Sequence, residues 1–333
     1  MINVGFIGAG NMGYAIMKGI AGSKMSKDIQ LYAFDKYAPI LDRLDELGTV
    51  KCSGCAEVVE KSEYVFLAIK PQQLDEVLDE IASAVTKDTV IVSICAGITD
   101  DYIASKTVAG AKVVLVMPNT PLLLGEGATA LSRSDSVTDE EFELVCNIFG
   151  SCGMYAVISK DKMKEIIAIN GSSPAFIYLY AQAFVEYAKS VDIDETVARD
   201  LFAKSLIGSA KMITDSGKSL DELIEMVSSK GGTTIAGLEK LREGGLPKAG
   251  EECCKACTRE LTSFQNSYFF CTVAYTLLKG VMYNEQRDRH IQKRSSCFFC
   301  RSYPNWCAFG CCYFLLYGQR RAFNAVGVFK QLR

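Results

Sequence analysis

The sequence predicts an α/β protein, with an N-terminal Rossmann-type parallel sheet followed by a C-terminal all-helical domain. Three observations carry this prediction. Short apolar runs alternate with segments of helical spacing over the first half of the chain. A glycine-rich turn follows the first of these runs. Beyond about residue 160 the strand pattern stops and only helical spacing continues.

Five segments of the first half are predicted to be strands. Each is an apolar, β-branched run, which is typical of a parallel strand buried on both faces. The intervening segments have helical spacing, and Thr138 with Glu141 forms a capping box that opens a helix. The predicted strands are Ile2–Ile7, Ile29–Phe34, Tyr64–Ile69, Thr89–Cys95 and Lys112–Met117.

The second half is predicted to be helical. Phe176, Tyr180 and Phe184 share one helical face, and a capping box at Ser219 and Glu222 opens another helix. We therefore predict a dinucleotide-binding domain over residues 1–160 and a helical substrate and dimerisation domain over 161–262. Residues 263–333 are a divergent tail of unknown role, rich in cysteine and aromatic residues.

Composition and charge exclude several classes of protein. A net charge of −3 over 333 residues argues against nucleic-acid or acidic-membrane partners, which require a basic surface. The N-terminus lacks the features of a signal peptide, and Ser267–Tyr283 is marginal for a membrane span, so a cytoplasmic protein is expected. Three of the pairs among the 14 cysteines have CxxC spacing, but His290 is the single histidine. We expect reduced thiols and no metal site.

The glycine-rich turn has the GxGxxG pattern of a dinucleotide-binding loop. The first glycine permits the tight turn, the second allows the backbone to approach a pyrophosphate, and the third allows close packing of helix on strand. The helix that follows offers free N–H groups and a partial positive charge to the phosphates. A purely structural glycine turn is the alternative. The loop is Gly8, Ala9, Gly10, Asn11, Met12 and Gly13.

Two charged residues at the end of the second predicted strand are candidates for contact with the ribose of the cofactor. Asp35 lies 22 residues beyond Gly13, where an acidic residue accepts a hydrogen bond from a ribose 2′-hydroxyl and favours NAD. Lys36 is placed to pair with a 2′-phosphate and would favour NADP. The sequence leaves NADH and NADPH both open.

The absence of histidine before position 290 restricts the chemistry. It excludes Ser-His and Cys-His nucleophilic catalysis in the core, and also the histidine proton relay of hydroxy-acid dehydrogenases. A reductase without histidine needs another proton donor or a substrate that is already protonated. A cyclic iminium meets the second condition.

Several motifs taken together resemble pyrroline-5-carboxylate reductase, the last enzyme of proline synthesis. They are the opening GFIGAGNMG, Ala68-Ile-Lys-Pro-Gln72, Met117-Pro-Asn-Thr-Pro121, Gly171-Ser-Ser-Pro-Ala175 and Ser229-Lys-Gly-Gly-Thr-Thr-Ile-Ala-Gly237. The resemblance covers residues 1 to about 260, and it implies a last helix from Lys248 through Arg259. It implies reduction of 1-pyrroline-5-carboxylate to L-proline by NADPH or NADH, in a homodimer that assembles into a larger oligomer.

The resemblance also implies roles for single residues. The turn at Gly232, Thr233 and Thr234 would hold the substrate carboxylate through backbone N–H groups, and the Thr234 hydroxyl would contact the ring nitrogen. Ser172 is either a substrate contact or an exposed helix cap. Residues that would border the cofactor or line the nicotinamide pocket are Ala68, Lys70, Pro71, Ala96, Gly97, Met117, Asn119 and Pro121.

Structural roles are the alternative for these residues taken singly, and two departures from the family pattern concern the site. Lys230 stands where the family usually has proline, and Ser173 stands where it usually has glycine. Two rival functions follow. One is a related imine or β-hydroxy-acid reductase that uses Lys162 or Lys164, and the other is a non-catalytic nucleotide-binding protein.

Overall fold

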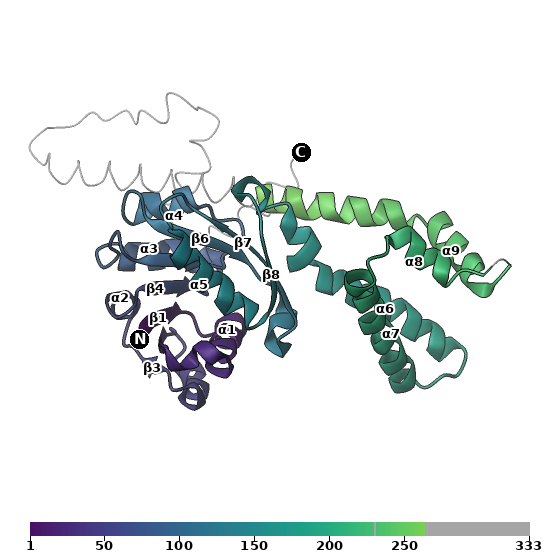
Figure 1. Ribbon diagram of the computed structural model, residues 1–333, viewed down its shortest axis with the longest axis horizontal. Coiled ribbons are helices and arrows are strands. Elements are labelled where there is room, and N and C mark those ends of the chain that lie inside the picture. The colour runs from purple at the N-terminus through teal and green to yellow at the C-terminus, as the bar shows by residue number, and fades with distance from the viewer. Residues whose placement is uncertain (230, 264, 266–333) are drawn as a thin grey trace, which may run out of the picture. The chain divides into compact units, whose positions relative to one another are not determined.

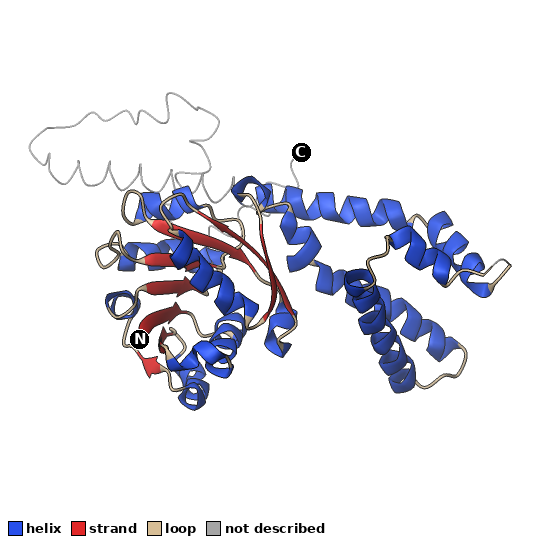
Figure 2. Ribbon diagram, in the orientation of Figure 1, coloured by secondary structure: helices blue, strands red, loops and turns tan. Residues whose placement is uncertain are grey.

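The structure is a computed structural model that describes residues 1–229, 231–263 and 265 (Figure 1). Its N-terminal half contains an eight-stranded sheet of order β3-β2-β1-β4-β5-β6-β7-β8 (Figure 2). Neighbouring strands are parallel except β6 and β7. The strands are β1 (Ile2–Ile7), β2 (Ile29–Phe34), β3 (Val50–Lys51), β4 (Tyr64–Leu67), β5 (Val90–Ser93), β6 (Lys112–Met117), β7 (Gly127–Arg133) and β8 (Gly153–Val157).

The sheet confirms the predicted fold class and extends it. Strands β1, β2 and β6 have the predicted bounds, whereas β4 and β5 each end two residues before the predicted end. The residues beyond those two ends, Ala68–Ile69 and Ile94–Cys95, form the turns at the carboxyl edge instead. Strands β3, β7 and β8 were not predicted, and β7 adds the one antiparallel pairing to a sheet expected to be parallel.

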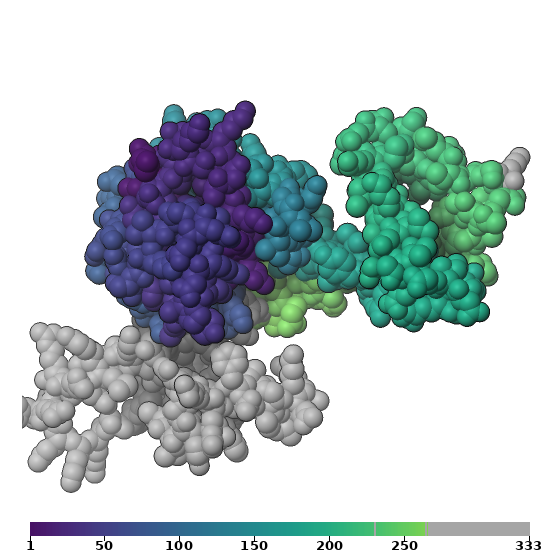
Figure 3. Space-filling view, turned by 90° about the horizontal axis from the view of Figure 1, so that it is seen from below, coloured from purple at the N-terminus to yellow at the C-terminus, as the bar shows by residue number. Residues whose placement is uncertain are grey.

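Two layers of helices cover the two faces of the sheet. Because side chains alternate along a strand, Tyr64 and Phe66 of β4 lie in one core and Val65 and Leu67 in the other. Phe6 and Phe66 stack in the first core with ring centroids 4.5 Å apart. The first core includes α1 (Asn11–Gly22) and α5 (Asp139–Gly150), and the second includes α2 (Cys55–Glu60), α3 (Leu74–Ile81) and α4 (Asp100–Lys106). In the space-filling view this N-terminal part is a continuous body, coloured purple and blue (Figure 3).

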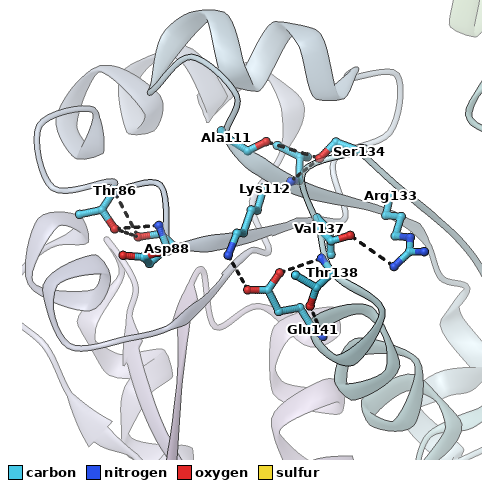
Figure 4. Close-up of polar contacts among 11 residues, drawn as sticks. Thr86, Asp88, Ala111, Lys112, Arg133, Ser134, Val137, Thr138 and Glu141 are labelled. Carbon is cyan, nitrogen blue, oxygen red and sulfur yellow. Dashed lines mark hydrogen bonds and ion pairs between the residues drawn. The ribbon is translucent and has the colours of Figure 1, made fainter.

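An ion pair beside the sheet ties β6 to α5 (Figure 4). The Lys112 Nζ lies 2.6 Å from Glu141 Oε1, and both side chains are less than 20% exposed, at 18% and 19%. Glu141 also accepts from the backbone N–H of Thr138, which completes the predicted capping box. Burial raises the pKa of Glu141, but the bonds from Lys112 and Thr138 outweigh it and leave the pKa lowered.

Short helical turns connect these elements. The 3-10 turns are η1 (Lys24–Lys27), η2 (Ala38–Leu47), η3 (Pro71–Gln73), η4 (Thr120–Leu124) and η5 (Lys160–Lys162). A π-helical turn, η6 (Ile167–Gly171), precedes the helical half of the chain. It packs against β6 and β7, so it joins the helical segment to the carboxyl edge of the sheet.

The helical half contains α6 (Ser173–Ser190), α7 (Glu195–Asp215), α8 (Leu220–Met226), α9 (Thr233–Glu243) and a helix over 246–263. The predicted capping box at Ser219 and the predicted last helix are both confirmed. Phe184 of α6 stacks on Phe202 of α7 with centroids 4.4 Å apart. Lys230, His290 and nearly all of the 263–333 tail lie outside the described residues, and so do the predictions made for them.

The helical half is poorly buried within one copy of the chain. No residue of α7, α8 or α9 is buried. Leu201 of α7 is 66% exposed and Ile213 is 54% exposed, although both are apolar. Large exposed apolar surfaces of this kind mark interaction sites.

Candidate cofactor and active site

The glycine loop lies at the carboxyl end of β1, where the strand order reverses. From β1 the chain adds β2 and β3 on one side and then returns to add β4 on the other. The crevice at such a reversal is the ligand site of open α/β sheets. The Gly8 N–H donates to Phe34 O at 2.8 Å, and the Ala68 N–H donates to Ile7 O at 2.9 Å. The loop is therefore held between the two neighbouring strands.

The surroundings of the three glycines are compatible with the roles that the pattern predicts. Gly8 has φ +100°, and a Cβ there would lie 2.4 Å from the Ala68 carbonyl oxygen. A Cβ at Gly13 would lie 2.4 Å from the Gly8 carbonyl oxygen, so both positions exclude a side chain. A Cβ at Gly10 would meet nothing within 4 Å. Space for a pyrophosphate thus exists beside Gly10, at the N-terminus of α1.

The N-terminus of α1 suits a phosphate. Gly10 is its N-cap and supplies no side-chain cap, and the first turn has no acidic residue. Asn11 and Met12 begin the helix, with the first helical bond running from the Tyr14 N–H to Gly10 O at 2.9 Å. The free N–H groups and the helix dipole of this turn favour an anion.

Asp35 follows β2 and contacts the loop directly. Its Oδ2 accepts from the Ala9 N–H at 2.7 Å, and its Oδ1 accepts from the Tyr37 N–H at 2.9 Å. Lys36 instead pairs with Glu76 at 3.1 Å on the surface. The structure thus joins Asp35 to the glycine loop and engages Lys36 elsewhere.

Arg43 is a cation at this site that sequence reasoning missed. It lies on η2, donates from Nη2 to the Ala9 carbonyl oxygen, and places its guanidinium 4.3 Å from the centroid of the Tyr14 ring. The peptide groups of Ala9 are therefore held by Asp35 on one side and Arg43 on the other. No sequence signal marks Arg43, because it reaches the loop from 34 residues away.

The predicted cofactor residues of the next two strands also lie at the carboxyl edge. Ala68, Lys70 and Pro71 follow β4, with Pro71 opening η3, and Ala96 and Gly97 follow β5. Gly97 has φ +80°, which a glycine adopts without strain.

Cys95 lies in the same turn as Ala96 but is not a candidate nucleophile. Its Sγ approaches the carbonyl oxygens of Leu67 and Ile69, and burial raises its pKa to about 11. A thiol with such a pKa remains protonated near neutral pH, and the thiolate is the nucleophilic form.

The carboxyl end of β6 is joined to η6 by two buried asparagines. The Asn119 Oδ1 accepts from the Ala128 N–H at 2.9 Å, and its Nδ2 donates to Asn170 O at 3.2 Å. Asn170 Nδ2 donates in turn to Met117 O at 2.7 Å and to Ala128 O at 3.0 Å. Asn119 thus positions the turn that precedes Pro121 of η4. Sequence reasoning missed Asn170, which no motif singled out.

Ser172 lies near this network. A Cβ at the preceding Gly171 would lie 3.5 Å from Met117 Sδ, so the start of α6 adjoins the predicted nicotinamide pocket. Ser172 occupies the N-cap position but makes no side-chain capping bond. Ser173 Oγ donates to Asn170 O at 3.4 Å, so the serine that replaces the family glycine faces the network.

A pocket of about 280 Å³ adjoins the ends of β5 and β6. Gly97, Met117 and Lys164 are among the residues that line it. Lys160 also lines it and pairs with the buried Asp100 at 2.9 Å. Lys162, which a β-hydroxy-acid reductase was expected to use, pairs with its neighbour Asp161 at 3.2 Å instead.

The Gly-Gly-Thr-Thr turn precedes α9. Gly231 has φ +71°, Gly232 is the N-cap, and Thr233 and Thr234 form the first turn of the helix. Their N–H groups lie at the positive end of an 11-residue helix. Among the described residues, no recorded hydrogen bond or ion pair joins this turn to the glycine loop or to Met117.

The fold and the loop define a dinucleotide-binding protein of the Rossmann class. Comparisons with known proteins are more specific. The family model for pyrroline-5-carboxylate reductase dimerisation matches residues 160–263, and the model for coenzyme F420-dependent NADP oxidoreductase matches residues 3–97.

Whole-chain relatives extend this result. Pyrroline-5-carboxylate reductase of Escherichia coli is 33% identical over 268 residues, which are 79% of this chain and 98% of the relative. Pyrroline-5-carboxylate reductase 3 of Danio rerio is 34% identical over 80% of this chain and 92% of the relative. The chain belongs to the pyrroline-5-carboxylate reductase family and is an NAD(P)H-dependent oxidoreductase.

Solved structures agree with the sequence comparisons. A Coxiella burnetii pyrroline-5-carboxylate reductase matches with a TM-score of 0.73 at 26% identity, over 79% of this chain and 98% of that one. The Plasmodium falciparum enzyme, solved with NADP bound, matches with a TM-score of 0.71 at 25% identity over the same shares. No helix among the described residues is long and apolar enough to cross a membrane.

Proposed function

We propose that this protein reduces 1-pyrroline-5-carboxylate to L-proline with NADPH or NADH. The observation that carries the proposal is a glycine loop with open space at Gly10 together with a Gly-Gly-Thr-Thr turn, both in a chain of this family. The cofactor supplies a hydride when it is bound. The substrate arrives as a protonated cyclic imine, so addition of hydride at carbon converts the C=N bond to the amine without a histidine.

The protein's part in the reaction is mainly orientation. Gly10 and the N-terminus of α1 receive the pyrophosphate, and Asn119 with Asn170 fixes Met117 at the edge of the nicotinamide pocket. The N–H groups of Thr233 and Thr234 hold the substrate carboxylate. The Thr234 hydroxyl accepts a hydrogen bond from the protonated ring nitrogen and so favours the electrophilic iminium form.

We propose that the active site is completed by a second copy of the chain. The exposed apolar side chains of α7, which include Leu201 and Ile213, supply surface for this dimer. The matched dimerisation model covers the same helices. The assembly of dimers into a larger oligomer, the boundary near residue 160 and a cytoplasmic location stay predictions.

Turnover by the full-length protein tests the proposal. Purified protein should oxidise NADH or NADPH only when 1-pyrroline-5-carboxylate is present, and L-proline should accumulate in equal amount. The variant Thr234→Val should lower kcat/KM by roughly tenfold to a hundredfold, because it removes a hydrogen bond to a charged group. Thr234→Ser, which retains the hydroxyl, is the matched control and should keep most of the activity. Binding of cofactor without proline formation would refute the proposal and favour a non-catalytic protein.

A further inference from the structure

We infer that this chain prefers NADH to NADPH and that Asp35 sets the preference. The inference rests on the proposed function only in assuming that a nicotinamide dinucleotide occupies the glycine loop. The sequence left the choice open between Asp35 and Lys36. The contacts of the two side chains now distinguish them.

Asp35 is held in place by the protein's own backbone. Both of its carboxylate oxygens accept backbone N–H groups, from Ala9 at 2.7 Å and from Tyr37 at 2.9 Å. Because one donor belongs to the glycine loop and the other to its own turn, rotation of the side chain would break two charge-assisted bonds. The carboxylate therefore remains at the end of β2, beside the loop that receives the pyrophosphate.

This position determines whether the protein favours a hydroxyl or a phosphate at the 2′ position of the adenosine ribose. In Rossmann domains the acidic residue at the end of the second strand accepts a hydrogen bond from the ribose 2′-hydroxyl of NAD. NADPH carries a phosphate at that oxygen, and two like charges within a few ångströms repel. A carboxylate that is held by two backbone donors has no alternative position in which to avoid the phosphate.

Neither nearby cation is placed to offset this repulsion. Lys36 pairs with Glu76, whose carboxylate brings a second negative charge to the same surface. Both side chains are more than 70% exposed, so Lys36 is solvated as well as paired. Arg43 already donates to the Ala9 carbonyl oxygen and stacks against Tyr14. Its Nε is buried, and a phosphate that displaced the Ala9 carbonyl oxygen from Nη2 would remove the bond that holds the glycine loop.

The test is a binding titration of the full-length protein with NADH and with NADPH, in the absence of any pyrroline substrate. The readout is the fluorescence of the reduced nicotinamide, checked by calorimetry. We expect the Kd for NADPH to exceed that for NADH by about tenfold or more. Asp35→Asn removes the charge and keeps the shape, so it should bring the two Kd values to within about threefold by tightening NADPH. Circular dichroism would verify that this variant is folded. The ratio of the two Kd values for the unmodified protein tests the inference even if the variant does not fold.

Lys36→Ala is the matched control, and it should leave the ratio unchanged. Tighter binding of NADPH than NADH by the unmodified protein would overturn the inference. So would a selective loss of NADPH affinity in Lys36→Ala or Arg43→Lys, because one of those cations would then be reading the phosphate. Preference for NADH without turnover of 1-pyrroline-5-carboxylate would contradict the proposed function alone. Turnover together with a preference for NADPH would contradict this inference alone.

Discussion

Replacement of Asn170 by alanine should destabilise the protein because two backbone carbonyl oxygens would lose a hydrogen-bond donor. Asn170 is 8% exposed, and its Nδ2 donates to Met117 O and to Ala128 O. Each buried acceptor that loses its donor costs about 1–3 kcal/mol. The Oδ1 of Asn170 has no partner among the described residues, so its removal relieves part of that cost. We expect the free energy of unfolding to fall by about 2 kcal/mol.

The assay is urea denaturation followed by far-UV circular dichroism, at one fixed protein concentration for every variant. Asn170→Asp keeps the shape but places an acceptor against two carbonyl oxygens, so it should cost more than the alanine variant. Ser173→Ala is the matched control, because its hydroxyl makes only a 3.4 Å bond in the same network, and it should cost less than about 0.5 kcal/mol. A loss below about 0.5 kcal/mol for Asn170→Ala, or an aspartate variant as stable as the parent, would refute the reasoning.

Three further outcomes are expected. Gly10→Ala should keep the thermal stability but weaken cofactor binding in a fluorescence titration. Gly8→Ala should lower both the thermal stability and the affinity for cofactor, because the added Cβ would clash with the protein's own backbone at Gly8 but not at Gly10. The lowered pKa of Glu141 means that its pair with Lys112 stabilises the protein above the unfolded pKa and that this contribution is lost as the pH falls through the lower, folded pKa. Glu141→Gln should therefore flatten the acid limb of a plot of stability against pH, and an unchanged limb would contradict the assignment. Leu201→Asp should shift the dimer to monomer in light scattering after gel filtration, because it places a charge on the exposed apolar side of α7.

Most of the strands that sequence reasoning predicted bury apolar side chains on both faces, as β4, β5 and most of β6 do. β2 alternates buried and half-buried residues, and the predicted bounds of β1, β2 and β6 are confirmed. β7 reads Gly-Ala-Thr-Ala-Leu-Ser-Arg, whose small and polar residues have no strong strand pattern. It is buried because β6 and β8 lie on either side of it, which is tertiary information. β8 is mostly exposed in one copy, and β3 has only two residues.

The candidate site likewise contains residues that the sequence could predict and residues that it could not. The glycine loop and Asp35 could be predicted because their spacing along the chain follows from one strand–helix–strand unit. Arg43 and Asn170 could not, since each acts through a hydrogen bond to a residue more than 30 positions away, over separations of 34 and 53. The roles of Thr233 and Thr234 came from the family resemblance and stay predictions.

The lack of buried residues in α7, α8 and α9 links association to folding. The sheet domain has two cores of its own, but these helices gain most of their burial only when something covers them. Their stability then follows mass action, and it decreases as the protein is diluted. At low concentration the chain would keep its nucleotide-binding half while the helices on either side of the Gly-Gly-Thr-Thr turn begin to melt. Cofactor binding and proline formation would then respond to dilution at different protein concentrations.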